Sequence, residues 1–200
     1  SLHVANEKFT HDKMSTIVNI IKNAFYELGD GEALELGLRK RLDVTLEEFL
    51  TVARKKAAYF EAYTCIGAIL GGGTEAEIEA LSKYGTALGM LIVMQDEYMD
   101  MIDSEEFLHR LKYECPPLPL LYALQNPETK KKVEAILKSR ITKQDTKKIL
   151  KIFDKTQEAN AFKTTAQNLA REAHTQLRKI KYKRELKLLI LALVTRFELL

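Results

Sequence analysis

Three acidic residues near the end of one apolar segment are the residues of this sequence best suited to chemistry. Asp96, Asp100 and Asp103 recur at spacings of four and three residues, and Glu97 follows the first of them. On an α-helix these spacings place the carboxylates on one face. Like charges so close together repel unless a cation offsets them, and ligands that are all oxygen favour magnesium over zinc. The cluster is therefore a candidate Mg²⁺ site, and a solvated acidic helix end is the simpler alternative.

A basic segment precedes a second apolar helix and is the natural counterpart of the acids. Arg54, Lys55 and Lys56 are followed by Ala57-Ala58-Tyr59-Phe60. Cations at such a boundary could grip a metal-bound phosphate. Ordinary surface lysines are the alternative.

The elements that position these residues are predicted to be helices throughout. Apolar residues recur at three and four positions, which indicates helices rather than strands. Thr45 with Glu48, Thr74 with Glu77, and Thr142 with Asp145 are capping pairs, and Asn126 before Pro127 is a further helix start. The predicted helices cover 12–40, 45–70, 75–102, 128–139, 142–178 with a break near 156–160, and 183–198. Three prolines predict an irregular connection over 112–117, with a short apolar helix after it.

Composition indicates one soluble domain over residues 1–200. Of the residues, 46% are hydrophobic and 30% are charged, which is typical of a globular domain. A net charge of +3 is too small to argue for nucleic acid. No apolar run is long enough for a membrane span, and residues 1–13 lack a signal-peptide pattern, so we expect a cytoplasmic protein. Cys65 and Cys115 are expected to be free thiols.

An ordered series of segments resembles the trans-prenyl (polyprenyl) diphosphate synthases. The segments are Gly31-Glu32-Ala33-Leu34-Glu35-Leu36, Lys55-Lys56-Ala57-Ala58-Tyr59, Ala68-Ile69-Leu70-Gly71-Gly72-Gly73, Asp96-Glu97-Tyr98-Met99-Asp100 and Leu118-Pro119-Leu120-Leu121-Tyr122-Ala123-Leu124. They are similar to that family's G-Q-x-x-D-L, K-T-A-x-Y, glycine-rich, second D-D-x-x-D and T-L-P-L-I-Y-A-L segments, in the same order. The resemblance implies an all-α helical bundle of the isoprenoid synthase type, missing its first helices.

The same resemblance implies a function and assigns roles to residues. Members of the family join isopentenyl diphosphate to an allylic diphosphate with the help of magnesium. By this analogy Asp96 and Asp100 would ligate Mg²⁺, with Glu97 as a longer, secondary ligand. Lys55 would contact the allylic diphosphate and act in catalysis together with Asp96. Lys56 and Glu32 would also bind substrate.

The sequence departs from the family pattern in three places. No first D-D-x-x-D motif precedes Gly31, so about the first third of the usual fold is expected to be absent. Ile92-Val93 replaces the family's F-Q pair, and Cys115 replaces a lysine, with Glu114 in place of a glycine. Either the chain is part of a longer protein or it is a reduced paralogue, and we expect no chain elongation by these residues alone.

Three functions on the resembled fold remain open on these observations, and an unrelated helical interaction protein with a similar pattern is a further alternative. The first is a prenyltransferase whose remaining part lies outside these residues. The second is a non-catalytic partner or regulatory subunit of a prenyl synthase, and the third is another diphosphate-ionising enzyme on the same fold. The apolar segments 45–70 and 75–95 further suggest a homodimer, or a heterodimer with a full-length homologue.

Overall fold

The computed structural model describes residues 10–138 and 140–198, and every regular element within these ranges is a helix. The helices are α2 (His11–Gly37), α3 (Leu46–Lys56), α4 (Ala58–Leu70), α5 (Glu75–Ile102), α6 (Ser104–Tyr113), α7 (Leu118–Leu124), α8 (Pro127–Leu137), α9 (Lys143–Phe153), α10 (Gln157–Gln176), the 3₁₀ turn η1 (Leu177–Lys179) and α11 (Arg184–Glu198). The expected all-α class is confirmed.

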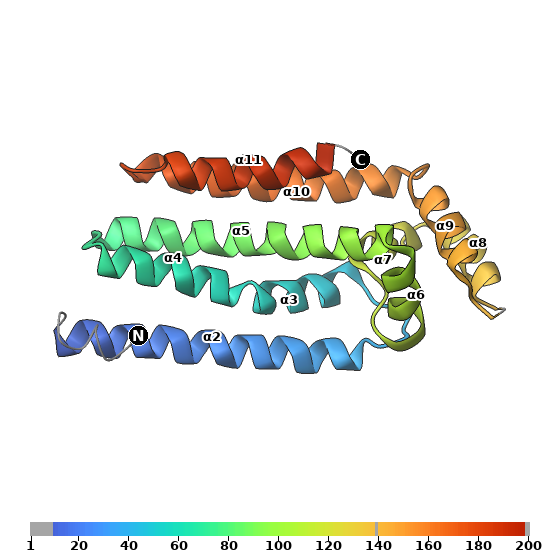
Figure 1. Ribbon diagram of the computed structural model, residues 1–200, viewed down its shortest axis with the longest axis horizontal. Helices are drawn as coiled ribbons and strands as arrows, with labels where there is room; N and C mark the ends of the chain where they lie inside the picture. The colour runs from blue at the N-terminus through green and yellow to red at the C-terminus, as the bar shows by residue number, and fades with distance from the viewer. Residues whose placement is uncertain (1–9, 139, 199–200) are drawn as a thin grey trace.

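Helix α5 is the central element of the bundle. It packs against α4 on one side and α10 on the other, while α2 lies against α3 and α4, and α11 lies against α10 and α5 (Figure 1). The shorter helices α6 to α9 gather at the end where α5 finishes (Figure 1). This arrangement brings the carboxylates of α5 close to α2, α3 and α6.

The core is formed by large apolar side chains of α5 and of the helices around it. Its most completely buried members are Tyr84, Phe49, Phe107, Phe162, Leu91, Met94, Met101, Leu118, Leu120, Leu121, Ile149 and Leu177. The Tyr84 hydroxyl is also satisfied, since it donates a hydrogen bond to the Leu186 carbonyl of α11 at 2.9 Å. Burial of this set holds α5 rigidly in place.

The predicted helix starts are confirmed. Thr45 and Thr74 each accept a hydrogen bond from the backbone N–H three residues later and are bound in return by Glu48 and Glu77. The Asp145 carboxylate accepts from the Thr142 N–H at 3.0 Å, and Asn126 caps α8. The break predicted near 156–160 falls at residues 154–156.

Two helix predictions need correction. The predicted helix over 45–70 is divided at Ala57, where Gly89 of α5 comes close to the Ala57 backbone and methyl group. Helix α6 was not predicted at all, although Asp103 and Glu106 have the spacing of a cap. The last residue of the predicted helix 128–139 lies outside the described residues.

Two simpler expectations concern membranes and thiols. None of the helices within the described ranges is both long and apolar enough to cross a membrane. Cys65 and Cys115 are both free, as expected.

Candidate functional site

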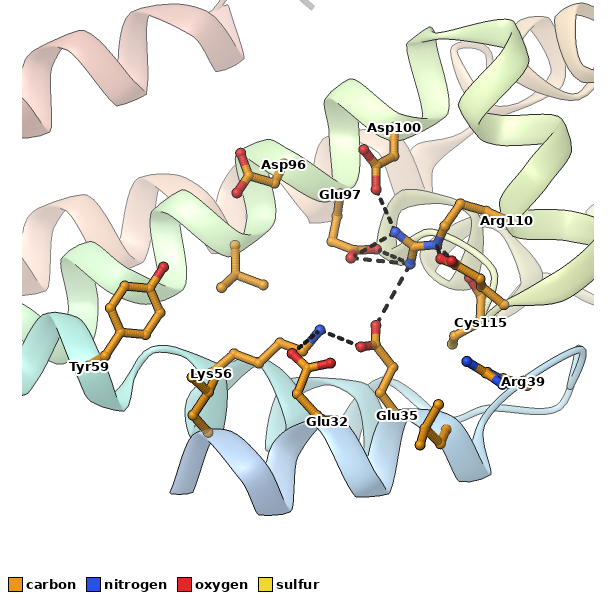
Figure 2. A pocket seen from close by; sticks show the side chains of 14 residues that line it. Glu32, Glu35, Arg39, Lys56, Tyr59, Asp96, Glu97, Asp100, Arg110 and Cys115 are labelled. Atoms are coloured by element: carbon orange, nitrogen blue, oxygen red, sulfur yellow. Dashed lines mark hydrogen bonds and ion pairs between the residues drawn. The ribbon is translucent and has the colours of Figure 1, made fainter. Parts of the chain in front are cut away.

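A pocket of about 600 Å³ opens where α2, α3, α5 and the connection after α6 meet. Figure 2 shows acidic and basic side chains facing one another across it. It is lined by Leu28, Glu32, Glu35, Leu36, Arg39, Lys56, Tyr59, Val93, Asp96, Glu97, Asp100, Arg110, Glu114 and Cys115. The structure thus brings Glu32, Lys56, Asp96, Glu97 and Asp100, all predicted from the sequence, to one site.

The carboxylates of α5 do not form the single acidic row that their spacing suggested. Asp96 and Asp100 lie one turn apart, with Asp96 on the side of the Tyr59 ring (Figure 2). Asp103 is not part of the cluster, because α5 ends at Ile102 and Asp103 caps α6. Its carboxylate accepts hydrogen bonds from the backbone N–H groups of Glu105 and Glu106 at 2.8 and 3.2 Å.

Glu97 is buried and fully engaged by neighbouring groups. Only 7% of it is exposed. Its two oxygens accept hydrogen bonds from both terminal nitrogens of the Arg110 guanidinium at 3.0 to 3.2 Å, and one also accepts from the Leu118 N–H at 2.9 Å. Such a bidentate pair fixes both side chains, so Glu97 is placed to anchor α6 and α7 on α5.

Arg110 reaches further acceptors around the pocket. Its Nη1 is 2.5 Å from the Asp100 carboxylate, and its Nε donates to the Cys115 carbonyl at 3.0 Å. Its Nη2 is 4.0 Å from the Glu35 carboxylate of α2. The guanidinium of α6 therefore lies among acidic side chains of α2 and α5 (Figure 2).

Burial and charge act against each other in this network. Burial raises the pKa of Glu97, and the charge and hydrogen bonds of Arg110 oppose that rise. Burial would lower the pKa of Arg110, but Glu97 and Asp100 outweigh it and keep the pKa above its ordinary value. Burial also raises the pKa of Cys115 to about 12, so this thiol stays protonated at neutral pH.

The two adjacent lysines of α3 face different surroundings. Lys56 lies in the pocket, where its ammonium is bound to the Glu35 carboxylate and is 3.2 Å from that of Glu32. Burial would lower the pKa of Lys56, but these carboxylates outweigh it and raise the pKa. Lys55 does not line the pocket, and its ammonium is 2.8 Å from both Glu27 and Asp30 of α2. The geometry therefore favours Lys56 over Lys55 as the cation that faces a bound anion.

The donor set for a magnesium ion is smaller than the sequence suggested. Within residues 10–138 and 140–198, no three acidic, histidine or cysteine side chains converge to hold a metal. Magnesium usually retains several waters and takes one or two protein carboxylates. Asp96 and Asp100 are the two α5 carboxylates that are not fully engaged by other groups of the pocket lining, although Asp100 contacts Arg110. Both oxygens of Glu97 already accept hydrogen bonds from Arg110, and one also accepts from Leu118.

The charge balance of the pocket is acidic. Six carboxylates line it, from Glu32, Glu35, Asp96, Glu97, Asp100 and Glu114, against three basic side chains, from Arg39, Lys56 and Arg110. A diphosphate could not bind here strongly without added cations, because it would face net negative charge.

An apolar hollow of about 260 Å³ adjoins the charged pocket and shares Leu28 and Tyr59 with it. It is bounded by Ile21, Ala24, Phe25, Leu28, Tyr59, Ala62, Tyr63 and Ile66 of α2 and α4. A ligand with a charged head and a hydrocarbon tail would fit the pair of cavities.

Sequence reasoning missed two residues that organise the site. Arg110 lies on helix α6, which was not predicted. Glu35 was noted only within the segment 31–36 that resembles the family, and no role was assigned to it. The Asp103–Glu106 cap was the one local signal for α6. Nothing local signals that Arg110 meets Glu97, because their contact depends on how α6 turns back onto α5.

Comparisons with known proteins agree with this fold. The sequence model of the polyprenyl synthetase family matches residues 3–154. A short chain isoprenyl diphosphate synthase from Methanothermobacter thermautotrophicus is 40% identical over 90 residues, which are 44% of this chain and 28% of that protein. A geranylgeranyl diphosphate synthase from Sulfolobus acidocaldarius is 26% identical over 133 residues, covering 66% of this chain and 37% of that protein.

Solved structures share the fold over nearly the whole chain. The geranylgeranyl pyrophosphate synthetase of Pyrococcus horikoshii superposes with a TM-score of 0.82 at 24% identity, covering 96% of this chain and 62% of that one. The chain thus covers less than two thirds of the length of each of these proteins. Because the family match extends over more than half of its residues, the chain belongs to the polyprenyl synthetase family.

Proposed function

We propose that this chain forms the diphosphate-binding part of a prenyltransferase that condenses isopentenyl diphosphate with an allylic diphosphate. One observation carries the proposal. The pocket with Lys56, Asp96 and Asp100 adjoins an apolar hollow, so that a charged head and a prenyl tail have adjacent places. The names of the similar proteins, which are isoprenyl and geranylgeranyl diphosphate synthases, support the same substrate class.

Magnesium belongs to this proposal because of the pocket's charge. An allylic diphosphate brings about three negative charges, and metal ions would offset them and stabilise the departing diphosphate. Asp96 and Asp100 would hold a hydrated ion. Lys56 would contact a diphosphate oxygen, and Tyr59 would separate the charged pocket from the apolar hollow.

These residues alone should not perform condensation. They supply one carboxylate cluster, and losing a single preorganised charge contact costs about 2.7–4 kcal/mol in a reaction barrier. A non-catalytic partner subunit is therefore the second candidate, favoured by the acidic balance of the pocket and by the ion pairs that already occupy Lys56 and Arg110.

Association with a second copy or with a longer homologue, and a cytoplasmic location, remain predictions. Of the two segments that suggested a dimer, 45–70 and 75–95, the second is covered by α4 and α10 of the same chain. Exposed apolar side chains lie on α2, at Phe25 and Tyr26, on α4, at Tyr63, and on α11, at Leu188 and Leu191. These helices are the better candidates for an interface.

The first test measures binding of geranyl diphosphate to the chain by isothermal titration with and without MgCl₂. We expect binding only with magnesium. Losing one hydrogen bond to a charged group costs about 1.5–3 kcal/mol, so Lys56→Met should weaken binding by roughly ten- to a hundredfold. Lys55→Met is the matched control, since it removes the same charge one residue away.

Two outcomes would change the proposal. If Lys55→Met has the larger effect, the role that the sequence gave to Lys55 stands and the geometric choice of Lys56 is wrong. If the unaltered chain binds no geranyl diphosphate at millimolar magnesium, the proposal of a diphosphate site fails.

A further inference from the structure

The Arg110 guanidinium occupies the position that a counter-ion would take among the acids of α5. The residue is 4% exposed. Its Nη1 contacts Glu97 and Asp100 at 3.2 and 2.5 Å, its Nη2 contacts Glu97 at 3.0 Å, and its Nε contacts the Glu114 carboxylate at 3.2 Å. Two of the α5 acids, Glu97 and Asp100, are therefore already paired with a buried cation of the chain itself.

This arrangement affects the carboxylates available to a metal ion. Asp100 is one of the two carboxylates that fit magnesium, and it is the partner closest to Arg110. A divalent ion on Asp100 would lie beside a guanidinium that cannot lose its charge, because the pKa of arginine is above 12. Metal binding must then either displace the Arg110–Asp100 pair or tolerate like-charge repulsion at short range.

Arg110 is also held where it is by contacts that do not involve Asp100. Its bonds to Glu97 and to the Cys115 carbonyl tie α6 to α5 and to the connection that leads to α7. The guanidinium can therefore release Asp100 while keeping its other partners. The Arg110–Asp100 pair is the exchangeable contact of the network, and the Arg110–Glu97 pair is the fixed one.

We propose that Arg110 is an internal competitor of magnesium for the α5 carboxylates, which neutralises Asp100 when no metal is bound and weakens the binding of metal alone. Arg110 is a positioning residue in this role. The inference rests on the proposed function only in taking Asp96 and Asp100 as metal ligands.

The test compares metal binding to matched variants in the absence of any diphosphate. Removing Arg110 alone would leave Glu97 buried without its partner, so the test variant is Glu97→Gln with Arg110→Gln. The control is Glu97→Gln with Lys112→Gln, which makes the same change in net charge on the same two helices. Titration of MgCl₂ by calorimetry, and of Mn²⁺ by its electron paramagnetic resonance signal, gives the affinity of each.

The variant without Arg110 should bind both ions more tightly than the control, by about 5- to 150-fold, the usual range for two coupled sites. Adding Asp100→Asn to it should cancel the gain. Circular dichroism and thermal unfolding of each variant establish that the affinities are measured on folded protein.

Equal affinity of the two double variants would overturn the proposal, and so would a failure of either ion to bind the variant without Arg110 at millimolar concentration. Either of these outcomes is distinguishable from failure of the proposed function. Diphosphate binding that depends on Lys56 is measured separately and with Arg110 intact.

Discussion

The two halves of α5 are held against neighbouring helices by different kinds of contact. In the first half, Gly85 and Gly89 allow α4 to approach so closely that a side chain would not fit. In the second half, Glu97 and Asp100 bind a buried guanidinium from α6. The first contact is set by volume and the second by charge.

The contact between Gly85 of α5 and helix α4 leaves no space for an added side chain. A Cβ atom at Gly85 would lie 2.2 Å from the Thr64 hydroxyl oxygen and 2.7 Å from the Glu61 Cα atom. The Thr64 hydroxyl is itself fixed, because it donates to the Leu81 carbonyl at 2.7 Å. The glycine contact thus aligns α4 with α5, and it sets where Tyr59 at the start of α4 stands relative to Asp96.

The electrostatic contact can be rearranged without moving helices. Glu35 contacts both Lys56 and Arg110, so a single carboxylate of α2 links the two cations across the pocket (Figure 2). Partners in such a network can exchange. We therefore expect the packed half to fix the geometry of the site and the charged half to be the part that rearranges when a ligand binds.

The largest effect on stability should come from breaking the charged half. Arg110→Met leaves Glu97 buried without its partner, and loss of one member of a buried ion pair costs about 3–5 kcal/mol. Urea unfolding measures the loss. Glu97→Gln with Arg110→Met should recover most of it, because no unpaired charge is then buried. A loss of under about 1 kcal/mol in the single variant would mean that the network is solvated and contributes little.

A smaller effect is expected from filling the packed half. Gly85→Ala should cost about 1–3 kcal/mol, since α4 must move away from α5 to admit the methyl group. Gly67→Ala is the control. It lies within α4 with nothing within 4 Å of the added atom, and alanine favours helix over glycine by about 1 kcal/mol. If both variants unfold at the same urea concentration, the helices are not in contact at Gly85.

Local sequence features were enough to predict most of the fold. The capping pairs at Thr45 and Thr74 define helix starts because their bonds join residues only three apart. The acidic segment 96–100 was likewise visible as a helical face. Helix α6 was missed because Asp103 was assigned to that face, although it caps the next helix.

The details of the site depend on contacts that no local pattern contains. Lys55 and Lys56 are adjacent, but consecutive residues of a helix point about 100° apart. Which of them enters the pocket is decided by the packing of α3 on α2, where each lysine finds its own pair of carboxylates. The role of Arg110 was equally hidden, since it depends on α6 folding back onto α5.

The smallest effect on stability is expected at the N-terminus of α5, where Thr74 caps the helix. The Glu77 carboxylate accepts from the Thr74 N–H at 2.9 Å and from its hydroxyl at 3.0 Å. Thr74→Ala should cost about 1 kcal/mol at pH 7, the usual value for a lost helix cap.

The hydrogen bonds of the same cap also predict how the thermal stability of the chain changes with pH. The backbone N–H and the hydroxyl of Thr74 lower the pKa of Glu77 below its ordinary 4.5. A carboxylate with a lower pKa in the folded chain stabilises it above pH 4.5, and this contribution is lost as the pH falls through the folded value. Thermal unfolding of Glu77→Gln should therefore occur below the wild-type temperature at pH 7, and the difference should shrink below pH 4.5.

Glu75→Gln removes the same charge from the same turn and leaves the cap intact, so it should show a smaller difference at pH 7. If Glu75→Gln and Glu77→Gln behave alike at every pH, the effect is that of charge near the helix end, and the cap contributes nothing of its own.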